Sequence, residues 1–491
     1  MFKSELTASP SIFEPRWIEH RQKDALDALK QGAIEDIRMS QKLPVDDLVL
    51  FGLKEGFLQK GLRLFPDPRK RVEVPIDVIL LSQILQRLND EHSLLLAPYM
   101  LNSAELITRL GYNASHLTDG FNDRAVHKRE TPYHGETLKH ILMSTRAPQL
   151  LSWFNQDWLT IWRENSPGRT KQYILDGTIL EIPEQHVNFY DGAGTRRIEH
   201  KDGSVTVTHG YKIVWLVEII DRKSMIVAMD IAPIQTHDIE LARPLLDRFE
   251  FEPNSSIICD RGFIDGDWIT RMKQTRGVDF FIPLKKNMDV TQAAISFADN
   301  RKLWKAHPTR EGQLIADIPT PDLFWKECPV LAYGVLARWN MRDGHVEQVL
   351  FVTTQSGHDG KSILATYDQR FEIEENHRQL KCFQGLATLP SKKLSQIVFR
   401  IVMGVLGFNL MQLFLNSEGC EKFEHYSLKT LRQKRVEEKN PELIIYTATS
   451  FAVLRQYEFL PVILKLKRSI QKRLIEVFEG LHSAASSPAF S

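Results

Sequence analysis

The spacing of apolar residues changes character near residue 171. Before this point, apolar positions recur with the period of an amphipathic helix, for example in segments 78–88 and 136–144. After it, the segment 173–182 is rich in β-branched residues and ends at Pro183, a pattern typical of a buried strand. The chain is therefore expected to be mainly helical over residues 1–165 and to contain a sheet after them.

The elements expected after residue 171 follow one another in an informative order. The same pattern predicts further strands over 211–220, 225–232, 255–260 and 278–284, with helices around 241–249 and 265–276, the second of them capped by Gly277. The first of these helices contains Pro244, which is expected to kink it or to shift its start. Three strands, a helix, a strand, a helix and a strand form the order of a ribonuclease-H-like core, whose sheet mixes an antiparallel hairpin with parallel crossover strands.

A second β-rich stretch separates this core from a later helix. Residues 286–360 contain a predicted hairpin, and a long helix is expected from about Ile363 to Phe383. The predicted fold class is α/β, with a ribonuclease-H-like mixed-sheet core interrupted by a β-rich insertion and with helical N- and C-terminal regions. The expected boundaries are 1–165 for the N-terminal region, 166–285 and 361–415 for the two parts of the core, 286–360 for the insertion, and 416–491 for the C-terminal region.

Composition restricts the function only weakly. The 491 residues are 43% hydrophobic and 25% charged, as in an ordinary globular protein of several structural units. There are 63 Lys and Arg against 62 Asp and Glu, so the overall charge does not by itself indicate a nucleic-acid partner. The four cysteines form no CxxC pair, which argues against a zinc site and against a disulfide framework.

The sequence does not indicate a membrane protein. The most apolar stretch, 397–414, carries Arg400, Asn409 and Gln412, and this favours a buried core helix over a membrane span. The first residues lack the apolar segment of a signal peptide. We therefore expect a cytoplasmic protein without membrane contact.

One face of the predicted helix 363–383 combines several polar side chains. At 100° per residue, a stripe about 60° wide holds Tyr367, Arg370, Glu374 and Lys381. Such a group is costly to bury without polar partners. Taken alone, a stripe of this kind is most often a solvated, salt-bridged helix face, and that interpretation stays open beside a functional one.

The same four residues carry a family resemblance. Their spacing, Tyr-x2-Arg-x3-Glu-x6-Lys, resembles the signature of DDE insertion-sequence transposases of the insertion-sequence-four type, and the segment from Asp260 to Phe263 resembles that family's second-Asp segment. In the family, the first Asp lies on the first strand of a ribonuclease-H-like core, the second follows the fourth strand, and the Glu completes the triad. The resemblance therefore implies Asp176, Asp260 and Glu374 as catalytic and metal-binding residues. Taken singly, Asp176 is better explained as a turn acid and Asp260 as a cap; only their joint placement with Glu374 favours the triad.

The resemblance also implies an activity and its partners. It predicts the transposase of a prokaryotic insertion sequence, a nucleoid-associated enzyme that cleaves and rejoins DNA. Two hard cations held by carboxylates can activate an attacking oxygen and stabilise a leaving one, so Mg²⁺ is the expected cofactor, with Mn²⁺ as a substitute. Arg370 and Lys381 are implied to contact phosphates, and Tyr367 to hold the DNA beside the cleavage site. The expected partners are double-stranded DNA at the terminal inverted repeats, target DNA, and a second copy in a homodimer on paired ends, with residues after 416 as the contact.

Two other functions would use the same residues. A ribonuclease-H-like nuclease would cut with the same acids without joining strands. A catalytically silent DNA-binding or inhibitory derivative would be marked by loss of a triad acid, and none is missing.

Several further segments carry weaker signals. Residues 103–117 resemble a helix-turn-helix, although a plain helical hairpin is the better explanation. Trp325 and Trp339 are better explained by hairpin packing than by stacking on a base. His237 and Asp238 are expected to start a helix and not to bind metal.

Overall fold

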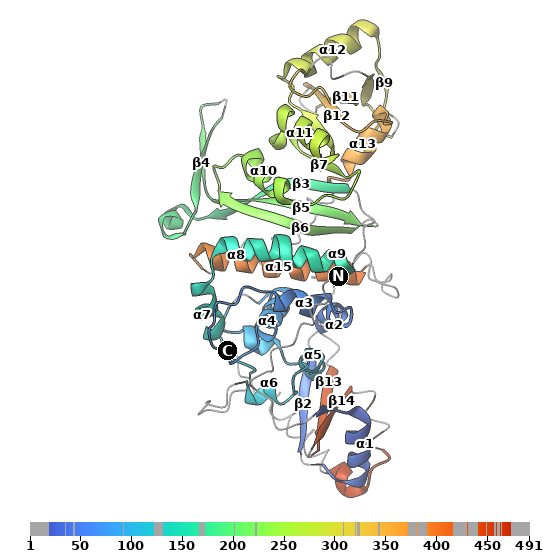
Figure 1. Ribbon diagram of the computed structural model, residues 1–491. Coiled ribbons are helices and arrows are strands. Elements are labelled where there is room, and N and C mark those ends of the chain that lie inside the picture. The colour runs from blue at the N-terminus through green and yellow to red at the C-terminus, as the bar shows by residue number, and fades with distance from the viewer. Residues whose placement is uncertain are drawn as a thin grey trace. The chain divides into compact units, whose positions relative to one another are not determined.

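The computed structural model divides into two units, one formed by Met1–Arg146 with Leu413–Ser491 and the other by Ala147–Gln412 (Figure 1). It describes residues 19–472 apart from gaps, which are single residues or short runs in most places and are longer at 122–130, 166–171, 372–379, 381–388, 416–429 and 431–439.

The unit Ala147–Gln412 is built on a 10-stranded sheet with the order β4-β5-β3-β7-β8-β12-β11-β10-β9, in which β6 also pairs with β5. Its strands are β3 (Gln172–Ile182), β4 (Gly194–Glu199), β5 (Val205–Ile220), β6 (Lys223–Pro233), β7 (Ser256–Cys259), β8 (Asp279–Leu284), β9 (Lys305–Ala306), β10 (Leu314–Ile318), β11 (Tyr333–Asn340) and β12 (Val346–Thr353). β6, β5 and β3 are antiparallel, whereas β3, β7 and β8 are parallel. The predicted mixed sheet of a ribonuclease-H-like core is thereby confirmed.

The strands between residues 286 and 360 continue this sheet. β12 pairs antiparallel with β8, and β11, β10 and β9 follow in antiparallel order. The predicted hairpin corresponds to β11 and β12. The segment is thus rich in strands as expected, but it extends the core sheet and does not form a separate layer, and its status as an insertion remains a prediction.

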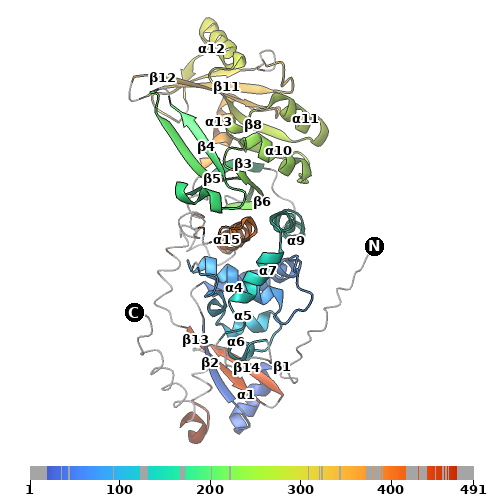
Figure 2. The same ribbon diagram turned by 90° about the vertical axis from the view of Figure 1, so that its left-hand side faces the viewer.

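Helices cover the faces of the sheet. In this unit they are α8 (Ala147–Ser152), the π-helical turn η2 (Trp153–Trp158), α9 (Leu159–Asn165), α10 (Asp238–Arg248), α11 (Gly266–Arg276), α12 (Asp289–Arg301), α13 (Gly360–Asp368) and α15 (Leu394–Leu415). α9 and α15 lie side by side next to β6 (Figures 1 and 2). α10 begins at Asp238 and accommodates Pro244, and Gly277 caps α11 in the left-handed region at φ 66°, as predicted.

Two asparagine side chains protect the free edge of β6. Asn409 of α15 accepts from the Ile226 amide at 3.1 Å and donates to the Ile226 carbonyl at 2.8 Å. Asn155 of η2 makes the same pair of bonds with Met229, both at 2.9 Å. A register shift between β5 and β6 at Leu216/Val217 lets these two positions, three residues apart, face the same edge. At these two positions the edge is therefore not free to pair with another chain, because the backbone groups are satisfied.

α15 is long and apolar enough to cross a membrane by length and composition alone, with a mean hydropathy of 1.8. However, 94% of its most apolar 18-residue window is buried inside the protein, and its Asn409 is engaged by β6. These facts agree with the expected core helix.

Glu218 on β5 makes the stability of this unit depend on pH. Burial raises the pKa of its carboxyl to about 7. Because this value lies above the usual one of about 4.3, the stabilisation is complete below pH 4.3 and is lost as the pH rises through 7. We expect Glu218→Gln to raise the melting temperature at pH 8 and to leave it unchanged near pH 4. Thermal melting across this range tests the expectation; an equal shift at every pH would contradict it.

The other unit joins the two ends of the chain in one sheet. Its helices are α1 (Gln22–Gln31), α2 (Asp46–Lys54), α3 (Phe57–Arg63), α4 (Ile76–Leu88), η1 (Ala97–Met100), α5 (Ala104–Arg109), α6 (His116–Asp119) and α7 (Glu136–Ser144). A four-stranded sheet has the order β1-β14-β13-β2, with β1 (Glu19–His20), β2 (Asp36–Lys42), β13 (Asn440–Tyr446) and β14 (Ser450–Arg455).

The prediction of a helical C-terminal region is therefore wrong for residues 440–455. β13 pairs antiparallel with β2 from the other end of the chain. α1 contributes Leu29 to a core cluster with Leu443, Ile445 and Leu454. The segment becomes a hairpin because partners about 400 positions earlier in the sequence bury its apolar residues, and a local helical pattern carries no information about such partners.

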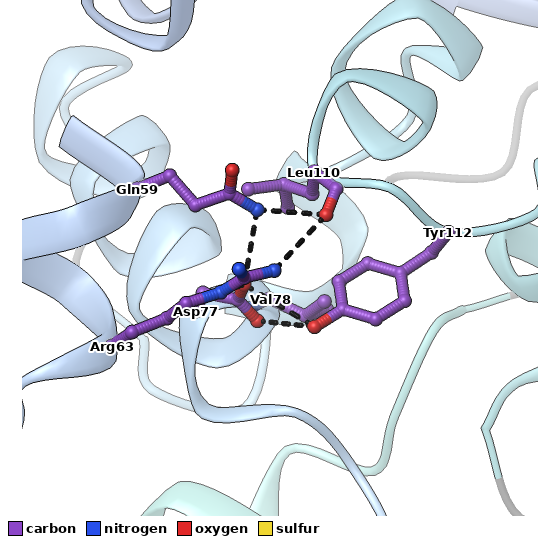
Figure 3. A network of polar contacts seen from close by, with 6 residues as sticks. All are labelled: Gln59, Arg63, Asp77, Val78, Leu110 and Tyr112. Atoms are coloured by element: carbon purple, nitrogen blue, oxygen red, sulfur yellow. Dashed lines mark hydrogen bonds and ion pairs between the residues drawn. The ribbon is translucent and has the colours of Figure 1, made fainter. Parts of the chain in front are cut away.

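A buried carboxylate organises α3, α4 and α5 (Figure 3). The side chain of Asp77 is 1% exposed and lies 2.9 Å from Arg63 Nε. The Tyr112 hydroxyl donates to it at 2.9 Å, and Gln59 and Arg63 both donate to the Leu110 carbonyl.

The segment 103–117 forms the short helices α5 and α6, which lie before and after Tyr112 in the sequence. They have only six and four residues, which favours the plain hairpin over a helix-turn-helix.

Candidate active site

Asp176 and Asp260 lie on neighbouring strands at the same level. β3 and β7 are parallel, and their last paired residues are Leu175 and Cys259. The next residue of each segment is one of the two acids, so both follow directly after the last paired position of β3 and β7. β7 ends at Cys259 while β3 continues to Ile182, so both acids lie at the carboxyl end of β7. Ligands of sheets with parallel strands bind at such ends.

Asp260 forms the start of a short turn. Its carboxylate accepts a hydrogen bond from the Gly262 amide at 2.7 Å and caps the 3₁₀ turn η4 (Arg261–Phe263). Burial is the main cause that raises the pKa of this carboxyl, and the nearby Asp238 raises it further. Asp260 thus caps the turn as expected from the sequence, and it also lies next to Asp176.

Arg370 reaches the same place from the end of α13. Its Nη1 lies 3.6 Å from Asp176 Oδ1, with side-chain exposures of 20% and 8%. Its guanidinium carbon lies 5.9 Å from the centre of the Tyr367 ring, which packs at 4.9 Å against Phe351 of β12. Burial raises the pKa of Tyr367 to about 12, so the phenol keeps its proton and remains a donor at neutral pH. Three of the six predicted site residues therefore lie together: Arg370 contacts Asp176 on one side and the Tyr367 ring on the other.

The predicted continuous helix from Ile363 to Phe383 is interrupted by a turn, after which the described residues Phe371 and Leu380 are helical again. α13 ends at Asp368, and Gln369 and Arg370 form a turn with hydrogen bonds to the third residue before them. Asp368 is held by Arg310 and Arg370 by Asp176, so tertiary ion pairs fall where the helix ends. The narrow stripe calculated for an unbroken helix does not extend across this turn. Glu374 and Lys381 lie outside the described residues.

A third acid, Asp238, stands beside these two. It is the first residue of α10, and its Oδ1 lies 3.0 Å from Lys212 Nζ on β5. A Cβ atom on Gly177 would lie 3.0 Å from one of its oxygens, and a Cβ on Gly262 would lie 3.0 Å from the other. The sequence predicted the helix start correctly, but no local signal distinguishes this acid from the many acids that begin helices.

The donor set fits a hard divalent cation. Asp176 and Asp260 offer carboxylate oxygens, the ligands that Mg²⁺ prefers. Among the described residues, which leave out Glu374, no group of three acids, histidines or cysteines is close enough to hold a metal. Two acids are compatible with an ion that retains waters and binds substrate phosphate.

Comparison with known proteins identifies this domain. A comparison of the chain with curated proteins finds no match. Residues 167–410 match the family model described as a transposase DDE domain. The matched segment begins just before β3 and ends within α15, so it contains the mixed sheet and the adjoining acids. This match supports a DDE transposase domain over residues 167–410, and DDE transposases generally use divalent metals.

Proposed function

We propose that the protein is the transposase of an insertion sequence of the insertion-sequence-four type, with Asp176, Asp260 and Glu374 as its metal-binding triad. The observation that carries the proposal is the side-by-side position of Asp176 and Asp260 at the end of β7, with Arg370 3.6 Å from Asp176. The spacing of Tyr367, Arg370, Glu374 and Lys381 supports the family subtype. Mg²⁺ is the proposed cofactor, with Mn²⁺ as a substitute.

The side chains have distinct tasks in this proposal. Asp176 and Asp260 bind and orient the divalent cations, and Glu374 supplies the third carboxylate. Divalent cations, when bound, lower the pKa of an attacking water or 3′-hydroxyl and stabilise the leaving oxygen. Arg370 holds a phosphate oxygen of the scissile strand, because its guanidinium lies 3.6 Å from Asp176 Oδ1. Lys381 binds a neighbouring phosphate, and Tyr367 donates its hydroxyl to the DNA.

The partners follow from the chemistry of transposition. Two element ends must be cut and joined together, so we propose a homodimer on paired terminal inverted repeats. Residues 1–165 are the proposed DNA-end binding region and residues after 416 the proposed dimer contact. Light scattering of the complex with end DNA counts the protein copies; a fully active complex with one copy would refute the dimer.

A plasmid assay tests the activity itself. A supercoiled plasmid that carries the inverted repeats flanking the gene is incubated with the protein and Mg²⁺. Cleavage at the repeat ends and joining to a second DNA are expected, and neither in the presence of chelator. Cleavage without joining would favour the nuclease, the second candidate, and binding without cleavage would favour a silent derivative.

The cations near the acids have a separate test. If Arg370 and Lys381 bind phosphates, replacing either with alanine should lower the slope of log affinity against log salt by roughly one unit. Arg271→Ala is the matched control, because Arg271 forms an exposed ion pair with Asp247 away from the acids. DNA binding titrated at several salt concentrations measures the slope. An unchanged slope together with a large loss of thermal stability would show that the cations only neutralise acids inside the protein.

A further inference from the structure

We propose that Asp238 and Lys212 form a positioning pair of the active site, which sets the charge and the spacing of the two strand ends that carry Asp176 and Asp260 and thereby sets the affinity for divalent cation. This inference rests on the proposed metal-dependent function. It concerns two residues outside the predicted triad.

The position of the Asp238 carboxylate supports a spacing role. One of its oxygens faces Gly177, directly after Asp176, and the other faces Gly262, two residues after Asp260. Neither glycine has a positive φ, so the backbone conformation does not require glycine at these positions. The close approach of carboxylates favours glycine instead, because a Cβ on either residue would lie 3.0 Å from an Asp238 oxygen, and a Cβ on Gly262 would also lie 2.9 Å from an Asp260 oxygen. Asp238 thus lies against both segments that present the acids.

The charge of the pair supports a role in cation binding. The Lys212 side chain is 8% exposed, and its ammonium lies 3.0 Å from Asp238 Oδ1. Among the described residues, Arg370 pairs with Asp176 and Lys212 pairs with Asp238. A Cβ on Gly262 would lie 2.9 Å from an Asp260 oxygen and 3.0 Å from an Asp238 oxygen, so the two carboxylates face the same glycine and the charge of Asp238 lies near the proposed metal ligand. A change of charge at either member alters the potential that a cation meets.

The two members should act in opposite directions. Asp238→Asn removes a negative charge and leaves the Lys212 ammonium, so cation binding should weaken by about tenfold or more, as for charges several Å apart at an effective dielectric near 20. Lys212→Met removes the positive charge and fills the same space, so cation binding should tighten. The double variant restores the charge balance and should lie between the single variants. If the ion pair were purely structural, both single variants would change thermal stability, but they would not change the cation affinity in opposite directions.

Calorimetric titration of the full-length protein with Mn²⁺ measures the affinity, and thermal melting of each variant measures its stability. Asp247→Asn is the matched control, since Asp247 lies on the same helix and pairs with the exposed Arg271. Weaker binding by Asp238→Asn and tighter binding by Lys212→Met, with Asp247→Asn unchanged, is the expected result. Equal affinities in all variants, or a change in the same direction for both members, would overturn the proposal.

The test separates this inference from the function on which it rests. Asp176→Asn is measured in the same titration. If it abolishes Mn²⁺ binding while the pair has no effect, the metal site stands and the positioning role falls. If wild-type protein binds no Mn²⁺, or if Asp176→Asn binds it normally, the proposed metal site fails and the pair's role with it. If Asp238→Asn fails to fold, Lys212→Met alone tests the positioning role of the pair. Unchanged Mn²⁺ affinity in Lys212→Met would then overturn that role.

Discussion

Replacing Asp176 or Asp260 with asparagine is expected to reduce DNA cleavage by on the order of 10³-fold or more, while binding of end DNA persists. The amide keeps the shape of the carboxylate but cannot neutralise a divalent cation. Glu374→Gln is expected to do the same. Cleavage of a plasmid with the inverted repeats in Mg²⁺ measures the loss, and a gel-shift titration measures binding. Cleavage near the wild-type rate by any of the three would remove that residue from the triad.

The two aspartates should differ in their effect on stability. Burial raises the pKa of the Asp260 carboxyl, so the ionised form of this side chain destabilises the folded state. The contribution of the protonated carboxyl to stability is complete below its usual pKa and is lost as the pH rises through the raised pKa. Asp260→Asn should therefore raise the melting temperature at pH 7 in chelator. Asp176→Asn should lower it, because Arg370 loses a partner that is 8% exposed. Mg²⁺ should stabilise the wild type and neither variant. Equal shifts for both variants would contradict this assignment of charges.

The largest loss of stability is expected for Asp77→Ala in the unit of Met1–Arg146 and Leu413–Ser491. Asp77 is 1% exposed and receives Arg63 Nε and the Tyr112 hydroxyl, both at 2.9 Å. Its removal takes the acceptor of the Tyr112 hydroxyl and leaves the half-exposed Arg63 with the Leu110 carbonyl and solvent, so we expect a cost of about 1–3 kcal/mol. Tyr112→Phe removes one hydrogen bond and should cost only about 1 kcal/mol.

Circular dichroism during thermal unfolding measures this loss. All tryptophans except Trp17 lie in the unit Ala147–Gln412, so tryptophan fluorescence reports mainly on that unit and not on the unit that contains Asp77. Asp27→Ala is the control, since Asp27 forms an exposed pair with Lys30 on α1 of the same unit, and it should have little effect. A melting curve of Asp77→Ala that matches the control would show that the network in Figure 3 contributes nothing to stability.

The sequence by itself determined the order of elements in the core. Strand periodicity, a left-handed glycine cap at Gly277 and a helix start at Asp238 depend on neighbours within a few residues, and all three are present in the structure. The prediction of a DDE transposase is supported by the family model that matches residues 167–410, whereas the subtype indicated by the motif spacing stays a prediction. Local chemistry was sufficient for these features because each is stabilised within its own segment.

Only the tertiary structure decided which distant residues meet. Residues 440–455 became a hairpin because β2 and α1 bury it, and α13 ended at Asp368 where ion pairs with Arg310 and Asp176 hold the chain. Asp238 entered the active site because α10 begins against the glycines that follow the two acids on β3 and after β7. Such contacts join residues tens to hundreds of positions apart, and their energy depends on packing and charge pairs that no local pattern encodes.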